Sequence, residues 1–173
     1  ITVKVAITDN GDGTLNVTKT TDSQEIVFTN TYSAEGAIIL AGTKSLNGRA
    51  LKAGEFSFEL YDGEGNKLQT ATNDANGAFA FEEIKYELAD AGKTFTYTVK
   101  EKAGNLPGVT YDAAPITVKV EISDNGDGTL NVAKTTDSAE IAFTNTYSAE
   151  GSIILAGTKS LSGRALAADE FSF

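Results

Sequence analysis

The chain has 173 residues, and its 24 acidic and 14 basic side chains give a formal net charge of -10 at pH 7. This charge argues against binding to nucleic acid or to an anionic membrane surface, and no apolar run is long enough for membrane insertion. Because Cys, His, Met and Trp are all absent, the usual nucleophiles, bases and metal ligands are missing, and we expect neither a conventional hydrolase nor a cofactor.

A long segment occurs twice: residues 1–58 return as residues 116–173, 115 positions later, with 49 of 58 positions identical. Such a repeat predicts a tandem array, and 115 residues suit one domain. We therefore expect residues 1–32 to end a preceding repeat, residues 33–147 to form one complete repeat, and residues 148–173 to begin the next. Only residues 148–151 join two repeats, so neighbouring repeats of the same chain are expected to lie close, end to end.

Apolar residues alternate with a period of two along most of the complete repeat. In chain order, the alternation predicts strands at 38–44, 56–60, 79–81, 95–101, 116–122 and 141–147. Clusters of Gly, Asn and Asp at 62–66, 73–77 and 124–128 predict tight turns, and only residues 82–91 have helical character. About seven to nine short strands at this spacing predict an all-β, immunoglobulin-like antiparallel sandwich.

Differences between the two copies test the predicted strand faces. If the phases are right, substituted positions lie on solvent faces, because core positions tolerate exchange poorly. The pairs that fall on predicted solvent faces are Ala6/Glu121, Thr8/Ser123, Val27/Ala142 and Ala37/Ser152.

Three polar side chains occupy positions on the apolar faces. Lys44 continues the face of Leu40, Glu101 that of Val99, and Asn145 that of Phe143. Burying any one of them alone costs several kcal/mol, roughly 2 to 7 for a neutral polar group and more for a charge. The three side chains therefore either lie at strand ends that reach water, or they meet one another inside the domain.

If they meet, they can react. Desolvation lowers the pKa of a lysine and raises that of a glutamic acid, which favours a neutral amine beside a neutral carboxylic acid. We expect Lys44 Nζ to attack the side-chain carbonyl of Asn145, with Glu101 polarising that carbonyl and relaying protons to the departing ammonia. The product is an intramolecular isopeptide bond. The alternative is a buried Lys–Glu ion pair hydrogen-bonded to an asparagine.

These three positions lie in motifs that resemble a known family. Gly42-Thr-Lys44, the segment from Tyr97 to Glu101 and the segment from Phe143 to Tyr147 are similar to those of isopeptide-linked pilin domains of Gram-positive bacteria. This is the family of the streptococcal major pilin shaft, related to the B-type repeats of collagen-binding adhesins. The resemblance covers the whole repeat. It implies Lys44 and Asn145 as bonded partners, Glu101 as the catalytic acid, and no enzyme activity beyond this single self-modification.

The resemblance also implies a place and a role. It indicates an extracellular, cell-surface protein whose repeats form a rigid structural stalk or fibre, with any host-surface ligand bound by other domains. Asn30 and Lys159 occupy the equivalent positions of the partial repeats, so only the Lys44–Asn145 bond closes within residues 1–173. There is no pilin motif with a Tyr-Pro-Lys core and no sorting signal, which favours a single-chain stalk over a sortase-polymerised one.

Two other functions have candidate residues in the sequence. The cluster at 124–128 and its copy at 9–13 contain acidic residues, but the spacing differs from a calcium-binding loop and favours a hairpin turn. A ligand-binding adhesin domain for a host protein or glycan needs a recognition face. Exposed aromatics at Tyr61, Tyr86 and Tyr111 are its only candidates, and packing in the core or at a strand edge is the commoner fate of such residues.

Overall fold

A computed structural model describes residues 1–173. Its regular structure consists of thirteen strands and one short 3₁₀ helix, η1 (Leu88–Asp90), which confirms the all-β prediction. No helix has the length and apolar character needed to cross a membrane. The chain divides into two compact units, the first formed by Ile1–Ile38, Glu83–Thr94 and Val120–Thr135, and the second by Ile39–Glu82, Phe95–Lys119 and Thr136–Phe173.

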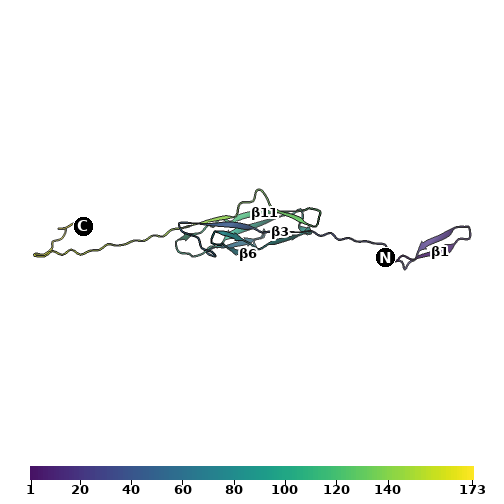
Figure 1. Ribbon diagram of the computed structural model, residues 1–173, viewed down its shortest axis with the longest axis horizontal. Coiled ribbons are helices and arrows are strands. Elements are labelled where there is room, and N and C mark those ends of the chain that lie inside the picture. The colour runs from purple at the N-terminus through teal and green to yellow at the C-terminus, as the bar shows by residue number, and fades with distance from the viewer. The chain divides into compact units, whose positions relative to one another are not determined.

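The first unit is built from antiparallel strand pairs. β1 (Val5–Asp9) pairs with β2 (Leu15–Lys19), and β3 (Glu35–Ile38) pairs with β8 (Ile84–Glu87), which leads into η1 (Figure 1). Residues 120–124 of β11 (Ile116–Asp124) pair with β12 (Leu130–Lys134). The β1–β2 and β11–β12 hairpins are formed by equivalent parts of the two copies of the repeated segment, and their registers are the same after a shift of 115 residues.

The two copies of this hairpin differ in burial. Val120 and Ile122 are buried, whereas their counterparts Val5 and Ile7 are 55% and 61% exposed. Identical strand pairing therefore forms in both copies, but only the second hairpin has a core to cover. Local turn chemistry is sufficient for the hairpin, and tertiary packing decides its burial.

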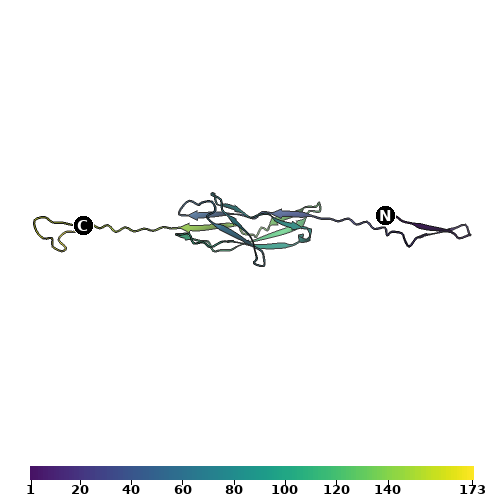
Figure 2. The same cartoon turned by 90° about the horizontal axis from the view of Figure 1, so that it is seen from below.

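The second unit is a two-layer sandwich. One sheet has the order β10 (Val109–Thr110), β13 (Ala142–Tyr147), β4 (Ala41–Asn47) and β7 (Ala78–Ala80). The facing sheet places residues 116–119 of β11 beside β9 (Thr94–Glu101), β5 (Ser57–Tyr61) and β6 (Lys67–Thr72); Figure 2 shows these strands from below. Phe58 stacks on Phe79 with ring centroids 3.7 Å apart, and Phe143 lies 5.4 Å from Phe58, so the inner faces of both sheets share one aromatic core.

The sandwich prediction is confirmed, but three of its details were wrong. The helical expectation for residues 82–91 fails because Ile84 and Tyr86 alternate with polar residues, so four residues form β8 and only three form η1. The single strand predicted at 38–44 is two strands, β3 and β4. Residues 33–147 contain eleven strands rather than seven to nine, because the predicted strand at 38–44 is divided in two and a strand of two residues such as β10 is too short to show a period.

The predicted solvent faces are correct at the four substituted positions that lie within residues 33–147. Glu121, Ser123, Ala142 and Ala37 are all exposed, while the alternating neighbours Ile122 and Phe143 are buried. Residues 148–173 form no strand (yellow end of the chain in Figure 1). Leu155 in this segment is 87% exposed, whereas its counterpart Leu40 is 1% exposed.

Candidate functional site

The site begins with the pairing of two strands. β4 and β13 are parallel neighbours, and Lys44 lies opposite Phe143 while Leu46 lies opposite Asn145. Gly42 permits this approach, because a Cβ at that position would lie 2.6 Å from both the carbonyl oxygen of Ile141 and the ring of Phe79. The absence of a side chain at Gly42 therefore allows β4, which carries Lys44, to lie against β13, which carries Asn145.

The structure brings the three polar side chains together inside the second unit. Lys44 Nζ donates to Glu101 Oε2 at 2.8 Å, and Asn145 Nδ2 donates to Glu101 Oε1 at 2.7 Å. The side chains of Lys44 and Glu101 are wholly inaccessible to solvent, and Asn145 is fully buried. Each carboxylate oxygen of Glu101 thus serves one partner, and the three groups do not reach water at the strand ends.

The amide of Asn145 has a defined orientation. Its Oδ1 accepts a hydrogen bond of 2.7 Å from the backbone N–H of Asp112. A backbone N–H can only donate, so the group that faces it must be the carbonyl oxygen, and Nδ2 then faces Glu101. In this arrangement the N–H of Asp112 donates to the carbonyl oxygen and Glu101 accepts from the amide nitrogen, so the expected polarisation of the carbonyl by Glu101 stays a prediction.

Asp112 is the residue that sequence reasoning missed. Its carboxylate accepts from the backbone N–H of Thr144 at 3.2 Å and from that of Ala114 at 3.1 Å. The first bond attaches the loop to β13 one residue before Asn145, and the second closes an Asx turn. Aspartate is common in turns, because its carboxylate can accept from the backbone N–H two residues later. Nothing in the sequence indicates that the backbone N–H of Asp112 faces Asn145.

Aromatic residues shield the lysine. The ring centroid of Phe56 lies 4.8 Å from Lys44 Nζ, and Tyr111 packs edge-on against Phe56 at 5.7 Å. The backbone N–H of Phe56 donates to Oδ1 of the buried residue Asn73. Burial lowers the pKa of Lys44 from its ordinary value, although the negative charges of Glu101 and Asp112 oppose this change. The enclosed environment favours the neutral amine, which is the nucleophilic form of lysine.

The equivalent residues of the terminal segments lie on the surface. Asn30 is exposed in the segment after β2. Lys159 is also exposed, and its Nζ lies 4.6 Å from the ring of Phe171. Phe171 is the copy of Phe56, so the lysine–aromatic contact forms in both copies, and in the second copy it forms without the rest of the site.

The residues considered for other functions have contacts within the fold. Asp124 Oδ1 accepts from Gly126 N at 2.9 Å, and Asp127 Oδ1 accepts from Thr129 N at 3.0 Å, so both carboxylates support their own turn. None of the three candidate tyrosines is exposed. Tyr61 donates to Glu59 at 2.6 Å, Tyr86 is buried, and Tyr111 accepts from Leu106 N at 3.3 Å.

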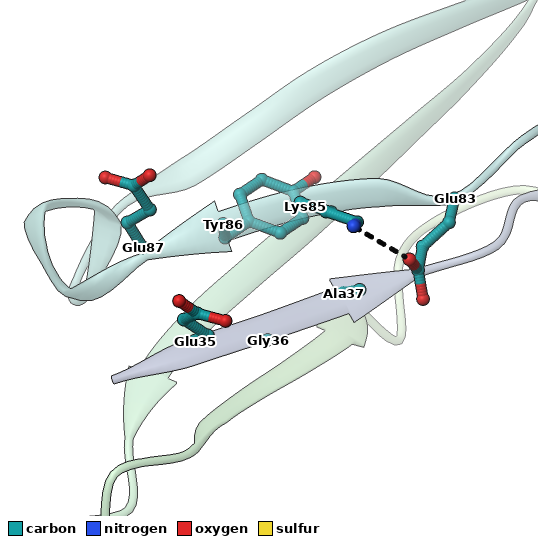
Figure 3. A pocket seen from close by; sticks show the side chains of 7 residues that line it. All are labelled: Glu35, Gly36, Ala37, Glu83, Lys85, Tyr86 and Glu87. Carbon is teal, nitrogen blue, oxygen red and sulfur yellow. Dashed lines mark ion pairs between the residues drawn. The ribbon is translucent and has the colours of Figure 1, made fainter. Parts of the chain in front are cut away.

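An open groove follows the paired strands β3 and β8 in the first unit. Glu35 and Glu87 are direct cross-strand partners, and Lys85 forms an ion pair with Glu83 at 3.8 Å (Figure 3). Like charges placed opposite each other repel, and the single lysine is neutralised by its neighbour. The groove presents no set of polar groups that converge on one point.

Comparison with known proteins agrees with the geometry. The model of the FctA family, described as a Spy0128-like isopeptide containing domain, matches residues 1–33 and 40–148. The chain belongs to this family. The resemblance to Gram-positive pilin isopeptide domains is thus confirmed, and such pilin domains are not an enzyme family. The longer match includes Lys44, Glu101 and Asn145, and the shorter one includes Asn30. The comparison with curated proteins found no match.

Proposed function

We propose that residues 33–147 form a structural repeat of a bacterial surface pilus or fibrous stalk, closed by an isopeptide bond between Lys44 and Asn145. The observation that carries this proposal is the buried contact of Lys44 and Asn145 with the two carboxylate oxygens of Glu101. Membership of a family of isopeptide-containing pilin domains supports it.

The reaction starts with proton transfer from Lys44 to Glu101, which their 2.8 Å contact and the lowered lysine pKa favour. Lys44 Nζ then forms a bond to Cγ of Asn145, and the negative charge that develops on Oδ1 is stabilised by the N–H of Asp112. Glu101 moves the protons and delivers one to the amide nitrogen that it already contacts, so that the Cγ–Nδ2 bond breaks. A lysine ammonium and a carboxamide thereby become a secondary amide and one ammonium ion, and the Glu101 carboxylate is regenerated.

The position of the bond suits a load-bearing domain. β4 and β13 are parallel, so a pull on the chain before β4 and after β13 shears one strand along the other. A covalent link between them carries this load directly and bypasses the hydrogen bonds of the sheet. The bond encloses about a hundred residues, which removes about 4 to 5 kcal/mol of denatured-state entropy by analogy with a disulfide. Unlike a disulfide, an amide cannot be reduced.

The repeated sequence extends the proposal to a series of such domains on the cell surface. Residues 1–32 end one repeat and residues 148–173 begin another, with neighbouring repeats as the partners at both ends. Asn30 then pairs with the lysine of the preceding repeat, and Lys159 with the asparagine of the following one. A single-chain stalk is the form that we favour, since the repeats are linked in one polypeptide.

The intact mass of the denatured chain tests the bond. We expect wild type to lack about 17 Da, one ammonia, and we expect Lys44→Ala, Asn145→Ala and Glu101→Ala to have their full calculated masses. Lys159→Ala is the matched control, because it removes the equivalent lysine of the partial repeat and leaves the deficit unchanged. A full mass for wild type would leave a buried ion pair with an asparagine partner and would overturn the proposed linkage.

A further inference from the structure

The turn formed by residues 124–128 binds a tyrosine that lies far away in the sequence. Tyr32 Oη donates to Asp124 Oδ1 at 2.8 Å, and the backbone N–H of Gly128 donates to Tyr32 Oη at 3.1 Å. Both contacts lie within the first unit. The phenol therefore uses its donor and an acceptor position on one turn, and a phenylalanine at position 32 can make neither bond.

The residues that follow Tyr32 are fixed to the same place. Ala34 is 2% exposed, and the backbone N–H of Glu35 donates to the carbonyl oxygen of Gly128 at 3.3 Å. Gly36 packs so closely that a Cβ would lie 2.8 Å from side-chain atoms of Leu130 and Val132 on β12. Figure 3 shows Glu35 and Gly36 on β3 beside β8. The short segment after Tyr32 is therefore docked and does not act as a loose tether.

Tyr147, the copy of Tyr32, shows how this tyrosine packs on the repeat that it ends. The guanidinium of Arg49 lies 4.9 Å from the centre of its ring. Gly108 lies so close to the ring that a Cβ there would be 2.9 Å from Cε2. Ser148 N donates to the carbonyl oxygen of Gly108 at 2.9 Å. All of these residues belong to the second unit, so the ring and the chain just after it are held by their own repeat.

We propose that the tyrosine ending each repeat connects neighbouring repeats. Its ring packs on its own repeat, and its hydroxyl binds the turn of the next repeat that corresponds to residues 124–128. The proposal rests on the proposed function in one respect, the tandem arrangement of repeats. Tyr147 supplies the first half of the joint and Tyr32 the second, because the two residues are copies of each other. The partner is thus a second repeat of the same chain, and the acidic turn is assigned to its recognition.

Such a joint restricts bending. The tyrosine hydroxyl, the Glu35 N–H and the buried Ala34 attach successive residues of the connection to one domain, while Arg49 and Gly108 contact the ring from the other. A rotation at the connection must break these contacts together. The stiffness of a stalk then depends on its joints as well as on the bond inside each domain.

The first test compares Tyr32→Phe with Tyr147→Phe in the full chain. Hydrogen exchange of the Gly128 amide, followed by NMR, is expected to be about fivefold faster in Tyr32→Phe, the effect of losing one hydrogen bond. Backbone relaxation is expected to show greater mobility of residues 33–36 in that variant. Tyr147→Phe is the matched control and leaves both measurements at wild-type values. Equal effects of the two variants, or no effect of Tyr32→Phe, would overturn the proposal.

The second test uses the two copies of the turn. The hydrogen bond to Asp124 raises the pKa of the Tyr32 phenol. Asp124→Asn keeps the turn, because its Oδ1 still accepts from Gly126 N, but it removes the charge beside the phenol. We expect an NMR titration of Tyr32 to move toward lower pH in Asp124→Asn and to stay unchanged in Asp9→Asn, the matched control. An unchanged Tyr32 titration in Asp124→Asn would refute the contact. The mass of the same samples reports on the isopeptide bond, so the two proposals fail separately.

Discussion

Gly42→Ala measures how closely β4 and β13 must approach for the lysine to reach its partner. The added Cβ would lie 2.6 Å from Ile141 Cγ2, from the carbonyl oxygen of Ile141 and from the ring of Phe79. The carbonyl oxygen is backbone and already accepts from Thr43 N at 2.9 Å, so relief requires the strands to separate and this hydrogen bond to lengthen. Overpacking of this kind costs about 1 to 3 kcal/mol, and a shift of about 1 Å at reacting groups can slow a reaction about a hundredfold.

The assay combines urea unfolding with intact mass at successive times after synthesis in a cell-free system. We expect Gly42→Ala to lower the free energy of unfolding and to accumulate the ammonia deficit much more slowly than wild type. Gly157→Ala is the matched control, since the equivalent glycine has no atom within 4 Å of an added Cβ. If Gly42→Ala reacts as fast as Gly157→Ala, the position of Lys44 does not depend on the close approach of these strands, and that reasoning is refuted.

Three further predictions concern the reacting groups. Asn145→Ala is expected to lose about 4 to 5 kcal/mol of loop-closure stabilisation, a shift of about 2 M in the urea midpoint, and an unchanged midpoint would contradict a covalent loop. Burial lowers the pKa of Lys44 in the folded state. Between this lowered pKa and the ordinary lysine pKa of about 10.4, the unfolded state of Asn145→Ala binds more protons than the folded state, so the free energy of unfolding of this variant should rise with pH in that range. The Lys44→Met/Asn145→Ala double variant serves as the baseline in that urea series, and parallel pH profiles would show that Lys44 does not titrate abnormally. The last variant removes only the backbone N–H of residue 112, by an amide-to-ester replacement made in the Asp112→Ala background. It should lose ammonia about 10²-fold to 10³-fold more slowly than Asp112→Ala with the normal amide, and equal rates would exclude a role for this N–H.

The core strands could be predicted from the sequence because alternation of apolar and polar residues is a local property. Val118, Val120 and Ile122 alternate with polar residues on β11, and all three are buried as the pattern predicts. The break between β3 and β4 could not be read in the same way. Residues 38 to 44 keep one phase, and the interruption at Ile39 and Leu40 depends on which strands pair on either side of it.

The candidate site was partly visible for the same reason. Lys44, Glu101 and Asn145 each violate the apolar pattern of a strand, so alternation alone exposes them as exceptions. Asp112 lies in a loop, where a polar residue is ordinary, and its contribution to the carbonyl comes from backbone rather than side chain. Asn73 is buried and holds Phe56 over the lysine, but it belongs to a turn cluster in which asparagine is expected. Roles that depend on where a loop folds back have no local signal.

The paired copies separate local from long-range structure. Residues 148–173 keep the short-range contacts of their counterparts, since Arg164 pairs with Glu170 as Arg49 does with Glu55, yet they form no strand. In residues 33–147, β4 pairs with β13 about a hundred residues later, and residues 148–173 have no such strand beside them. We therefore expect the β4–β13 pair to be among the last contacts to form, because its loop-closure entropy must be met before the pair gives any stabilisation. The proposed bond lies across that pair, so it can close only after the rest of the domain is in place. On the proposed mechanism, loss of ammonia would therefore report a completed fold, and the covalent bond would secure a contact that we expect to form late.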